Sequence, residues 1–133
     1  MTRRTIIAAI LSCILAGLAI PVFAVHGGEV IIGQQVVLRI RFPAGGFTVQ
    51  QRADEVTVRI NKLLGAQPFD PSDVKVGMRG KEYVVLMGDN LIITADKNTA
   101  AFNKTTPEQL ANIWAENLRR VIPRAKAEPI PNP

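Results

Sequence analysis

The sequence predicts an α+β domain: a mostly antiparallel sheet of about five strands, with two amphipathic helices packed on one of its faces. Two observations lead to this prediction. Several short apolar segments are separated by glycine-containing turns of the kind that joins antiparallel strands. Two longer segments carry apolar residues at spacings of three and four, which is typical of helices with one buried side. The predicted order along the chain is β-β-α-β-β-β-α.

The N-terminal segment, residues 1–24, has the organisation of a secretory signal peptide. Arg3 and Arg4 precede an apolar run, and the segment closes with the small-residue pattern Val22-Phe23-Ala24. We therefore expect export to the periplasm or the extracellular space, with cleavage after Ala24.

Two alternatives remain open for this segment. The apolar run is also long enough for an uncleaved membrane anchor, in which residues 5–24 cross the bilayer and the C-terminus lies outside. In the other alternative Cys13 carries a lipid, although the apolar run continues well past it. Because Cys13 is the only cysteine, residues 25–133 have no thiol for a disulfide, a redox centre or a thiolate metal site.

A leader is expected over residues 25–33, followed by a single domain over 34–122. Residues 29–42 have the alternation of one or two strands, with Gly33 as a bend. We expect the apolar face of the sheet to hold Val36, Leu38, Ile40, Val74, Val76 and Met78. The opposite face of the first strand region would then hold Val37, Arg39 and Arg41.

The first helix is predicted to begin after Thr48 and to end at Gly65. Thr48 is a favourable N-cap, and Gln51 three residues later completes a capping box. A single apolar stripe along this helix consists of Val49, Ala53, Val56, Ile60, Leu63 and Leu64.

After a proline-containing loop, an antiparallel meander is predicted over residues 74–95. Its three short strands are separated by "GK" and "GDN", and both sequences suit tight hairpin turns. Asp96 can then cap a short helical turn that runs through Phe102.

The second long helix is predicted to begin at Pro107, behind the N-cap Thr106. Proline is favourable at the first helical position because its missing N–H would have no partner there. Trp114 falls on the buried stripe of this helix. Pro123 is expected to stop the helix, and the charged, proline-rich residues 123–133 are expected to be disordered.

Few residues of this chain point to catalysis or to a metal. The only histidine, His26, lies just after the predicted cleavage site, and the aspartates lack the spacing of a calcium-binding loop. Without a histidine in the folded part there is no serine triad. We therefore expect no catalytic residue, no metal and no cofactor, and a chain that is not an enzyme.

Gly45 and Gly46 raise the question of a phosphate-binding turn, because they directly precede a helix. Neither a P-loop lysine nor the spacing of a dinucleotide fingerprint is present. The free N–H groups of a helix start can still attract an anion. Gly45, Gly46 and Thr48 are therefore a weak candidate anion site, and a purely conformational role for the two glycines is the favoured interpretation.

A cluster of cations is predicted on the outer face of the sheet. Arg39 and Arg41 share one side of their strand, and Lys75 and Arg79 share the polar side of another. If the two strands are neighbours, this basic face suits an anionic partner. The alternative is that an exposed sheet face needs charge for solubility.

The pattern of the chain resembles a small extracytoplasmic module that precedes the membrane part of some bacterial small-conductance mechanosensitive channels. The matching positions are Arg52-Ala53, Ile92-Ile93-Thr94-Ala95-Asp96 and Leu110-Ala111 with Trp114. The resemblance covers roughly residues 34–122. It implies a stand-alone, exported version of the module without channel activity.

We therefore expect a bacterial envelope domain of the binding type, which docks through its basic face to an anionic envelope component or a partner protein. A second hypothesis is a membrane-tethered assembly or sensor module that partners a membrane channel. A third is a small-anion binder at the Gly45–Thr48 turn. A nucleic-acid partner is not expected, because the formal net charge is only +5 and the chain carries an export signal.

Overall fold

The structure is a computed structural model that describes residues 27–127. The predicted signal peptide, His26 and residues 128–133 of the predicted tail lie outside the described residues. The elements in chain order are β1 (Glu29–Ile32), β2 (Gln35–Arg39), α1 (Val49–Ala66), the 3-10 turn η1 (Pro71–Asp73), β3 (Val74–Arg79), β4 (Glu82–Met87), β5 (Asn90–Thr94), α2 (Lys97–Phe102) and α3 (Pro107–Ala127). The α+β class and the predicted β-β-α-β-β-β-α order are confirmed.

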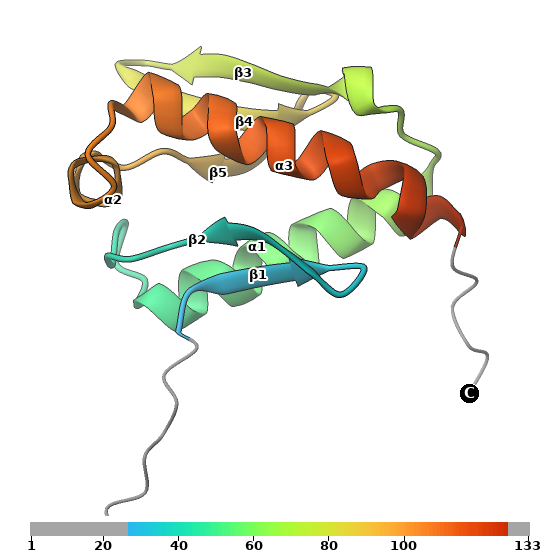
Figure 1. Ribbon diagram of the computed structural model, residues 1–133, viewed down its shortest axis with the longest axis horizontal. Helices are drawn as coiled ribbons and strands as arrows, with labels where there is room; N and C mark the ends of the chain where they lie inside the picture. The colour runs from blue at the N-terminus through green and yellow to red at the C-terminus, as the bar shows by residue number, and fades with distance from the viewer. Residues whose placement is uncertain (1–26, 128–133) are drawn as a thin grey trace, which may run out of the picture.

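The strands are divided between two antiparallel sheets. β1 and β2 form a hairpin, whereas β3, β4 and β5 form a meander with β4 in its centre. The sheets do not join because helices lie along their edges: α1 contacts β1 and β5, and α3 contacts β2, β3 and β4. Figure 1 shows α3 between the hairpin and the three-stranded sheet.

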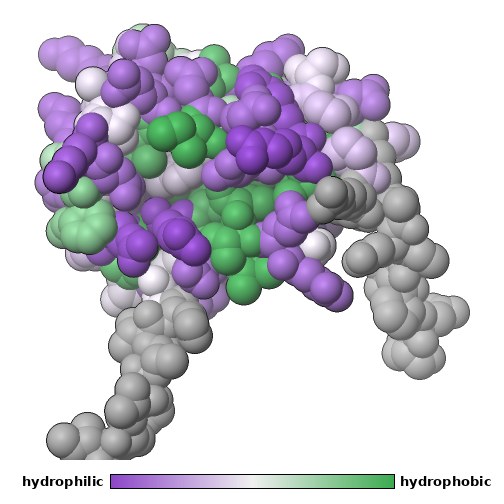
Figure 2. Space-filling view, in the orientation of Figure 1, coloured by the Kyte–Doolittle hydropathy of each residue, from purple (hydrophilic) through white to green (hydrophobic). Residues whose placement is uncertain are grey.

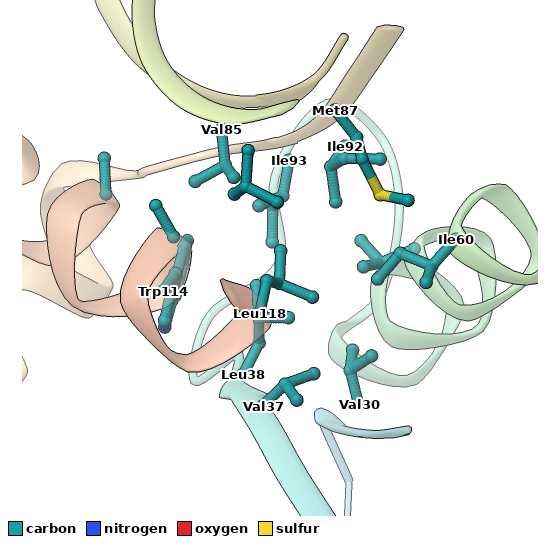
Figure 3. Close-up of a cluster of buried hydrophobic side chains, with 14 of the residues drawn as sticks. Val30, Val37, Leu38, Ile60, Val85, Met87, Ile92, Ile93, Trp114 and Leu118 are labelled. Atoms are coloured by element: carbon teal, nitrogen blue, oxygen red, sulfur yellow. The ribbon is translucent and has the colours of Figure 1, made fainter. Parts of the chain in front are cut away.

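One hydrophobic core fills the space between the hairpin, the three-stranded sheet, α1 and α3. Figure 3 looks into it, with the three-stranded sheet above, the hairpin below, α3 on the left and α1 on the right. Val85 and Ile92 come from the sheet, Leu38 from the hairpin, Ile60 from α1 and Leu118 from α3, and each is at most 1% exposed. Trp114 is also buried in this core, as its place on the α3 stripe predicted.

The two strands predicted over residues 29–42 are present as β1 and β2, although β1 lies within the segment 25–33 that was expected to be a leader. Gly28 shows why this region is ordered. It is buried with φ +91°, and its carbonyl accepts a hydrogen bond from the Ile40 N–H at 2.7 Å. A Cβ at this position would collide with the Ile40 carbonyl oxygen and with Val49, so only glycine fits.

The side chains of β2 do not follow the simple alternation that the sequence predicted. The ladder shifts register between Val30, which pairs with Leu38, and Ile31, which pairs with Val36. Val37 is therefore the extra residue of a β-bulge, and it is buried beside Leu38 instead of facing outward. Val36, expected inside, is 38% exposed. Met78, also expected inside, is exposed towards the end of β3.

The ends of the helices follow local chemistry. Thr48 Oγ1 accepts a hydrogen bond from the Gln51 N–H, and Gln51 Oε1 accepts one from the Thr48 N–H, which confirms the predicted capping box. α1 continues one residue beyond Gly65. The expectation that Pro123 stops α3 is wrong: the helix passes through it to Ala127. Val121 and Ile122 are buried just before the proline, so core packing holds this turn.

Candidate functional site

A cleft with charged walls lies between α1 and the outer edge of β5. Its volume is about 230 Å³. We call it the α1–β5 cleft. Its charged lining residues are Arg52, Glu55, Arg59, Glu82 and Asp96, and its apolar lining residues include Phe47, Val56, Leu91 and Ile93.

The α1 side of the cleft is one row of residues on a single helix face. Arg52, Glu55, Val56 and Arg59 are spaced at i, i+3, i+4 and i+7, so they point to the same side of α1. β5 is an edge strand, and its outward carbonyl groups need partners. The arginines supply them: Arg59 Nη1 donates to the Ile92 carbonyl at 3.2 Å, and Arg52 Nη2 donates to the Thr94 carbonyl at 3.3 Å.

The inner end of the cleft is closed by a buried ion pair. Arg52 Nη1 lies 2.9 Å from Asp96 Oδ2, and the two side chains are only 9% and 14% exposed. Arg52 Nη1 also donates to the Phe42 carbonyl at 2.7 Å. Asp96 Oδ1 accepts a hydrogen bond from the Thr99 N–H at 2.7 Å, which confirms Asp96 as the N-cap of α2. This pair therefore joins α1, β5 and α2.

The mouth of the cleft carries the charges that a ligand can reach. Arg59 Nη2 lies 3.8 Å from Glu55 Oε2, and these side chains are 42% and 52% exposed. Glu82 at the start of β4 is exposed, and its carboxylate makes no ion pair within residues 27–127. Phe47 is 45% exposed beside them. The mouth thus offers a guanidinium, carboxylates and an apolar ring.

The two glycines that precede α1 have a conformational role. Gly45 and Gly46 have φ values of +61° and +81°, and Ala44 and Phe47 form a bridge around them. Two positive φ values in succession define the type I′ turn, which favours glycine. The backbone N–H of Thr48 is already used in the capping box. Gly45 lines the cleft, but an anion site at Gly45, Gly46 and Thr48 remains only a prediction.

The four predicted cations do not share one face of a sheet. Arg39 lies on β2 and Arg41 just after it, whereas Lys75 and Arg79 lie on β3 in the other sheet. The condition for the basic face, that the two strands are neighbours, is therefore not met. The physical reason is the intervention of α3, which contacts β2 on one side and β3 on the other.

Three of these cations have local partners, one of them being Arg79, whose Nη2 donates to the Asp89 carbonyl at 3.5 Å. Arg39 Nε lies 3.2 Å from Glu29 Oε1, across the β1–β2 ladder. The Arg41 guanidinium lies over the ring of Phe102, 5.6 Å from its centroid. Lys75 and Arg79 are exposed on the face of β3 that points away from the core.

A second concavity, of about 340 Å³, lies between α3 and the edge of β2. We call it the α3–β2 groove. Asn117 Nδ2 donates across it to the Val37 carbonyl at 3.0 Å. Figure 2 shows apolar side chains gathered over the hairpin and α3 on this face. The residues that line the groove include Val36, Arg39, Leu110, Ile113, Trp114 and Asn117.

Neither metal ligation nor membrane crossing is indicated by the part of the chain that the structure describes. Residues 27–127 contain no group of three or more histidine, cysteine or acidic side chains placed to hold a metal ion. Among the same residues, no helix combines the length and the hydropathy that a membrane span requires.

The sequence analysis missed the buried ion pair, although one signal was present. Arg52 precedes Val56 by four residues and so lies beside the apolar stripe of α1. An arginine in that position needs a buried anion, but nothing in the sequence selects Asp96, which is 44 residues away, as that anion. Glu82 carried no signal, because a glutamate that follows a hairpin turn is usually only a solvated charge.

The chain matches the family described as "Domain of unknown function (DUF8459)" over residues 29–125. This match covers most of the chain, and the protein therefore belongs to that family. No solved structure matches the chain. Nothing in these comparisons bears on the resemblance to the channel-associated module, which stays a prediction.

A curated relative comes from Synechocystis sp. and is named "Probable endolytic peptidoglycan transglycosylase RlpA". It is 38% identical over 83 residues, which are 60% of this chain. The match covers 25% of the relative, so the chain corresponds to about a quarter of that protein's length. The similarity links this domain to a protein named for acting on the cell wall.

This relative corrects one expectation from the sequence. The lack of a recognisable catalytic motif led us to expect a chain that is not an enzyme. A relative that is named as a transglycosylase contradicts that expectation. Glycan cleavage depends on carboxyl groups, and neither Glu82 beside Tyr83 nor the pair Glu108 and Glu116 has a spacing that distinguishes a catalytic carboxyl group from a solvent-exposed charge.

Proposed function

We propose that this member of the DUF8459 family is an exported envelope domain that binds peptidoglycan, with the α1–β5 cleft as its binding site. The observation that carries the proposal is the 38% identity with a protein named for acting on peptidoglycan. The signal-peptide pattern of residues 1–24 supports export towards the compartment that contains this polymer.

The choice of the cleft rests on chemistry. Peptidoglycan combines neutral amino sugars with short peptides that carry carboxylates and amines. The α1–β5 cleft presents Arg59, Glu55 and Glu82 at its mouth, so it offers partners for both kinds of charge. The α3–β2 groove has a mainly apolar and amide lining, and its one cation, Arg39, is paired with Glu29.

Co-sedimentation with isolated peptidoglycan sacculi tests the proposal. The full chain, as recovered from bacteria that express it, is mixed with the insoluble polymer, and the bound fraction is measured after centrifugation. We expect saturable binding, which Arg59→Gln weakens about tenfold because it removes the exposed cation of the cleft. Glutamine is two bonds shorter than arginine, so the substitution also removes the hydrogen bond from Arg59 Nη1 to the Ile92 carbonyl.

The chain supplies a matched control in Arg120. Arg120 and Glu116 form an i,i+4 pair at 3.8 Å on α3, as Arg59 and Glu55 do on α1. Arg120→Gln should leave binding unchanged. Equal losses from both variants, or no binding of the parent chain, would reject the proposal.

Glycan cleavage is a second candidate function, because the relative is named as a transglycosylase. A carboxyl group that protonates the leaving oxygen is the minimum requirement for such a reaction. Glu55 and Glu82 both line the cleft and are exposed. Release of soluble fragments from sacculi, lost in both Glu55→Gln and Glu82→Gln, would support this candidate; no release by the parent chain would remove it.

Docking of an anionic component remains a separate hypothesis for Lys75 and Arg79. The double charge reversal Lys75→Glu with Arg79→Glu tests it in the same sedimentation experiment. If this variant loses binding and Arg59→Gln does not, the outer face of β3 is the binding surface. The hypothesis of a membrane-channel partner is tested by cross-linking in cells. It predicts that this chain is recovered in a cross-linked product with a membrane protein.

A further inference from the structure

The α1–β5 cleft has room for only a small part of a polymer. Ligand pockets for drug-sized molecules measure about 300–1,000 Å³. The cleft, at about 230 Å³, falls below this range. It can therefore admit a side chain or a chain end, but it cannot enclose a glycan strand of several sugars.

The inner wall of the cleft is not available for charge recognition. Arg52 already donates to Phe42, Thr94 and Asp96, and Asp96 accepts from Arg52 and Thr99. Both side chains are almost completely buried. At the inner end of the cleft, a ligand therefore contacts the Arg52–Asp96 pair, whose charges already bind each other. Only the exposed charges at the mouth of the cleft can bind charged groups of a ligand.

At the mouth, two groups of opposite charge have capacity for a ligand. Arg59 donates through Nη1 to Ile92 and faces Glu55 at the long distance of 3.8 Å, and a guanidinium carries five N–H donors in all. Glu82 is exposed and makes no ion pair in the described part of the chain. The two residues line the same cleft at different positions: Arg59 from α1 lies at the Ile92 carbonyl, whereas Glu82 from β4 lies towards the Asp96 end, because the Tyr83 carbonyl accepts from the Ala95 N–H.

We propose that the cleft recognises the peptide of peptidoglycan, with Arg59 binding a carboxylate and Glu82 binding the free amine of the diamino residue. This inference rests on the proposed function and names the part of the polymer that is bound. Sugar hydroxyls can donate hydrogen bonds to a carboxylate but carry no charge, whereas a stem peptide carries carboxylates and an ammonium along a chain of several residues and so matches both charges of the cleft.

Two forms of the polymer separate this inference from the proposed function. Sacculus fragments carry peptides, whereas an amidase removes the peptides and leaves soluble glycan strands that no longer sediment. The full chain is therefore coupled to beads, and the amounts of peptide-bearing fragments and of stripped strands that the beads retain are measured. We expect at least tenfold less retention of the stripped strands. Equal binding to both forms would overturn the inference and leave the proposed function standing. Binding to neither would reject both.

A competition experiment assigns the two charges. The probe is the tetrapeptide L-alanyl-D-glutamyl-meso-diaminopimelyl-D-alanine, acetylated at its N-terminus as a mimic of its amide link to the glycan. We expect it to displace the chain from sacculi. A second probe, acetylated also at the diaminopimelate amine, should compete about five- to tenfold less well, because the ammonium has been removed.

The variants then give different patterns with the two probes. Glu82→Gln should weaken the first probe to the level of the second and leave the second unchanged. Arg59→Gln should weaken both probes equally, and Arg120→Gln neither. If Glu82→Gln weakens both probes by the same factor, or if the two probes compete equally with the parent chain, the assignment of Glu82 to the amine is wrong.

Discussion

The α1–β5 cleft and the α3–β2 groove are built by the same device but differ in charge. In each, a helix lies beside the outer edge of an edge strand, and a helix side chain donates to a strand carbonyl. In the cleft the donors are Arg59 and Arg52, and in the groove the donor is Asn117. An amide that donates a hydrogen bond to a strand carbonyl carries no charge. A guanidinium that donates the same hydrogen bond keeps its positive charge and has further N–H donors for a ligand.

The difference shows that the protection of a strand edge, which both sites require, can produce either a charged or an uncharged surface. Both edges must be protected because unpaired strand edges invite association with other chains. Arg119 does the same at the start of β3, where Nε and Nη2 donate to the Val74 carbonyl at 3.1 and 2.9 Å. Protection by arginine next to carboxylates makes the cleft a candidate for binding charged ligands, whereas protection by asparagine adds no charge to the groove.

The largest effect is expected from Arg52→Met, at the closed end of the cleft. The substitution removes the partner of Asp96 and leaves a nearly buried carboxylate without its cation. Breaking a buried pair in this way costs about 3–5 kcal/mol. Urea denaturation followed by circular dichroism measures the loss. A loss below about 1 kcal/mol would show that water reaches Asp96 and that the end of the cleft is open.

Asn117→Ala in the groove should have a smaller effect. It removes one neutral hydrogen bond and leaves the Val37 carbonyl without that donor, which costs about 1–2 kcal/mol. The same denaturation assay applies, with Asn112→Ala as the control, because Asn112 donates only to a carbonyl of its own helix. Loss of binding to sacculi in Asn117→Ala, at unchanged fold, would shift the binding site to the groove.

Arg59→Gln should separate stability from binding. The Arg59–Glu55 pair is about half exposed, and such i,i+4 pairs contribute about 0.3–0.5 kcal/mol. Loss of the hydrogen bond to the Ile92 carbonyl adds about 0.5 kcal/mol, so we expect the free energy of unfolding to fall by about 1 kcal/mol while binding to sacculi falls about tenfold. A loss of stability above about 1.5 kcal/mol would instead place Arg59 with Arg52 as a structural residue of the β5 edge.

Ile113→Ser is expected to have the smallest effect. Ile113 is 51% exposed at the rim of the groove, and surface substitutions of this kind usually change stability by no more than about 0.5 kcal/mol. Neither the denaturation midpoint nor the bound fraction should move. A clear loss of binding would mean that the apolar groove contributes to the interaction and that the charge contrast between the two sites is not decisive.

The sequence by itself determined the features that depend on neighbouring residues. Thr48 and Gln51 set the start of α1, Asp96 set the start of α2, and Gly80 and Gly88 set the two hairpin turns. Each of these features joins groups a few positions apart, so the amino-acid types suffice to predict it. The same holds for the apolar stripes that bury Ile60 and Trp114.

Only the tertiary structure decided how these elements are arranged. The division into two sheets, the inward turn of Val37 at the bulge and the passage of α3 through Pro123 all depend on packing between distant segments. The same is true of the cleft, which Arg59 and Glu82 line from two different elements and in which Arg52 pairs with Asp96. Local propensity cannot specify such contacts. Their free energy comes from burial and charge pairing, and both arise only when the hairpin, the three-stranded sheet, α1 and α3 pack together.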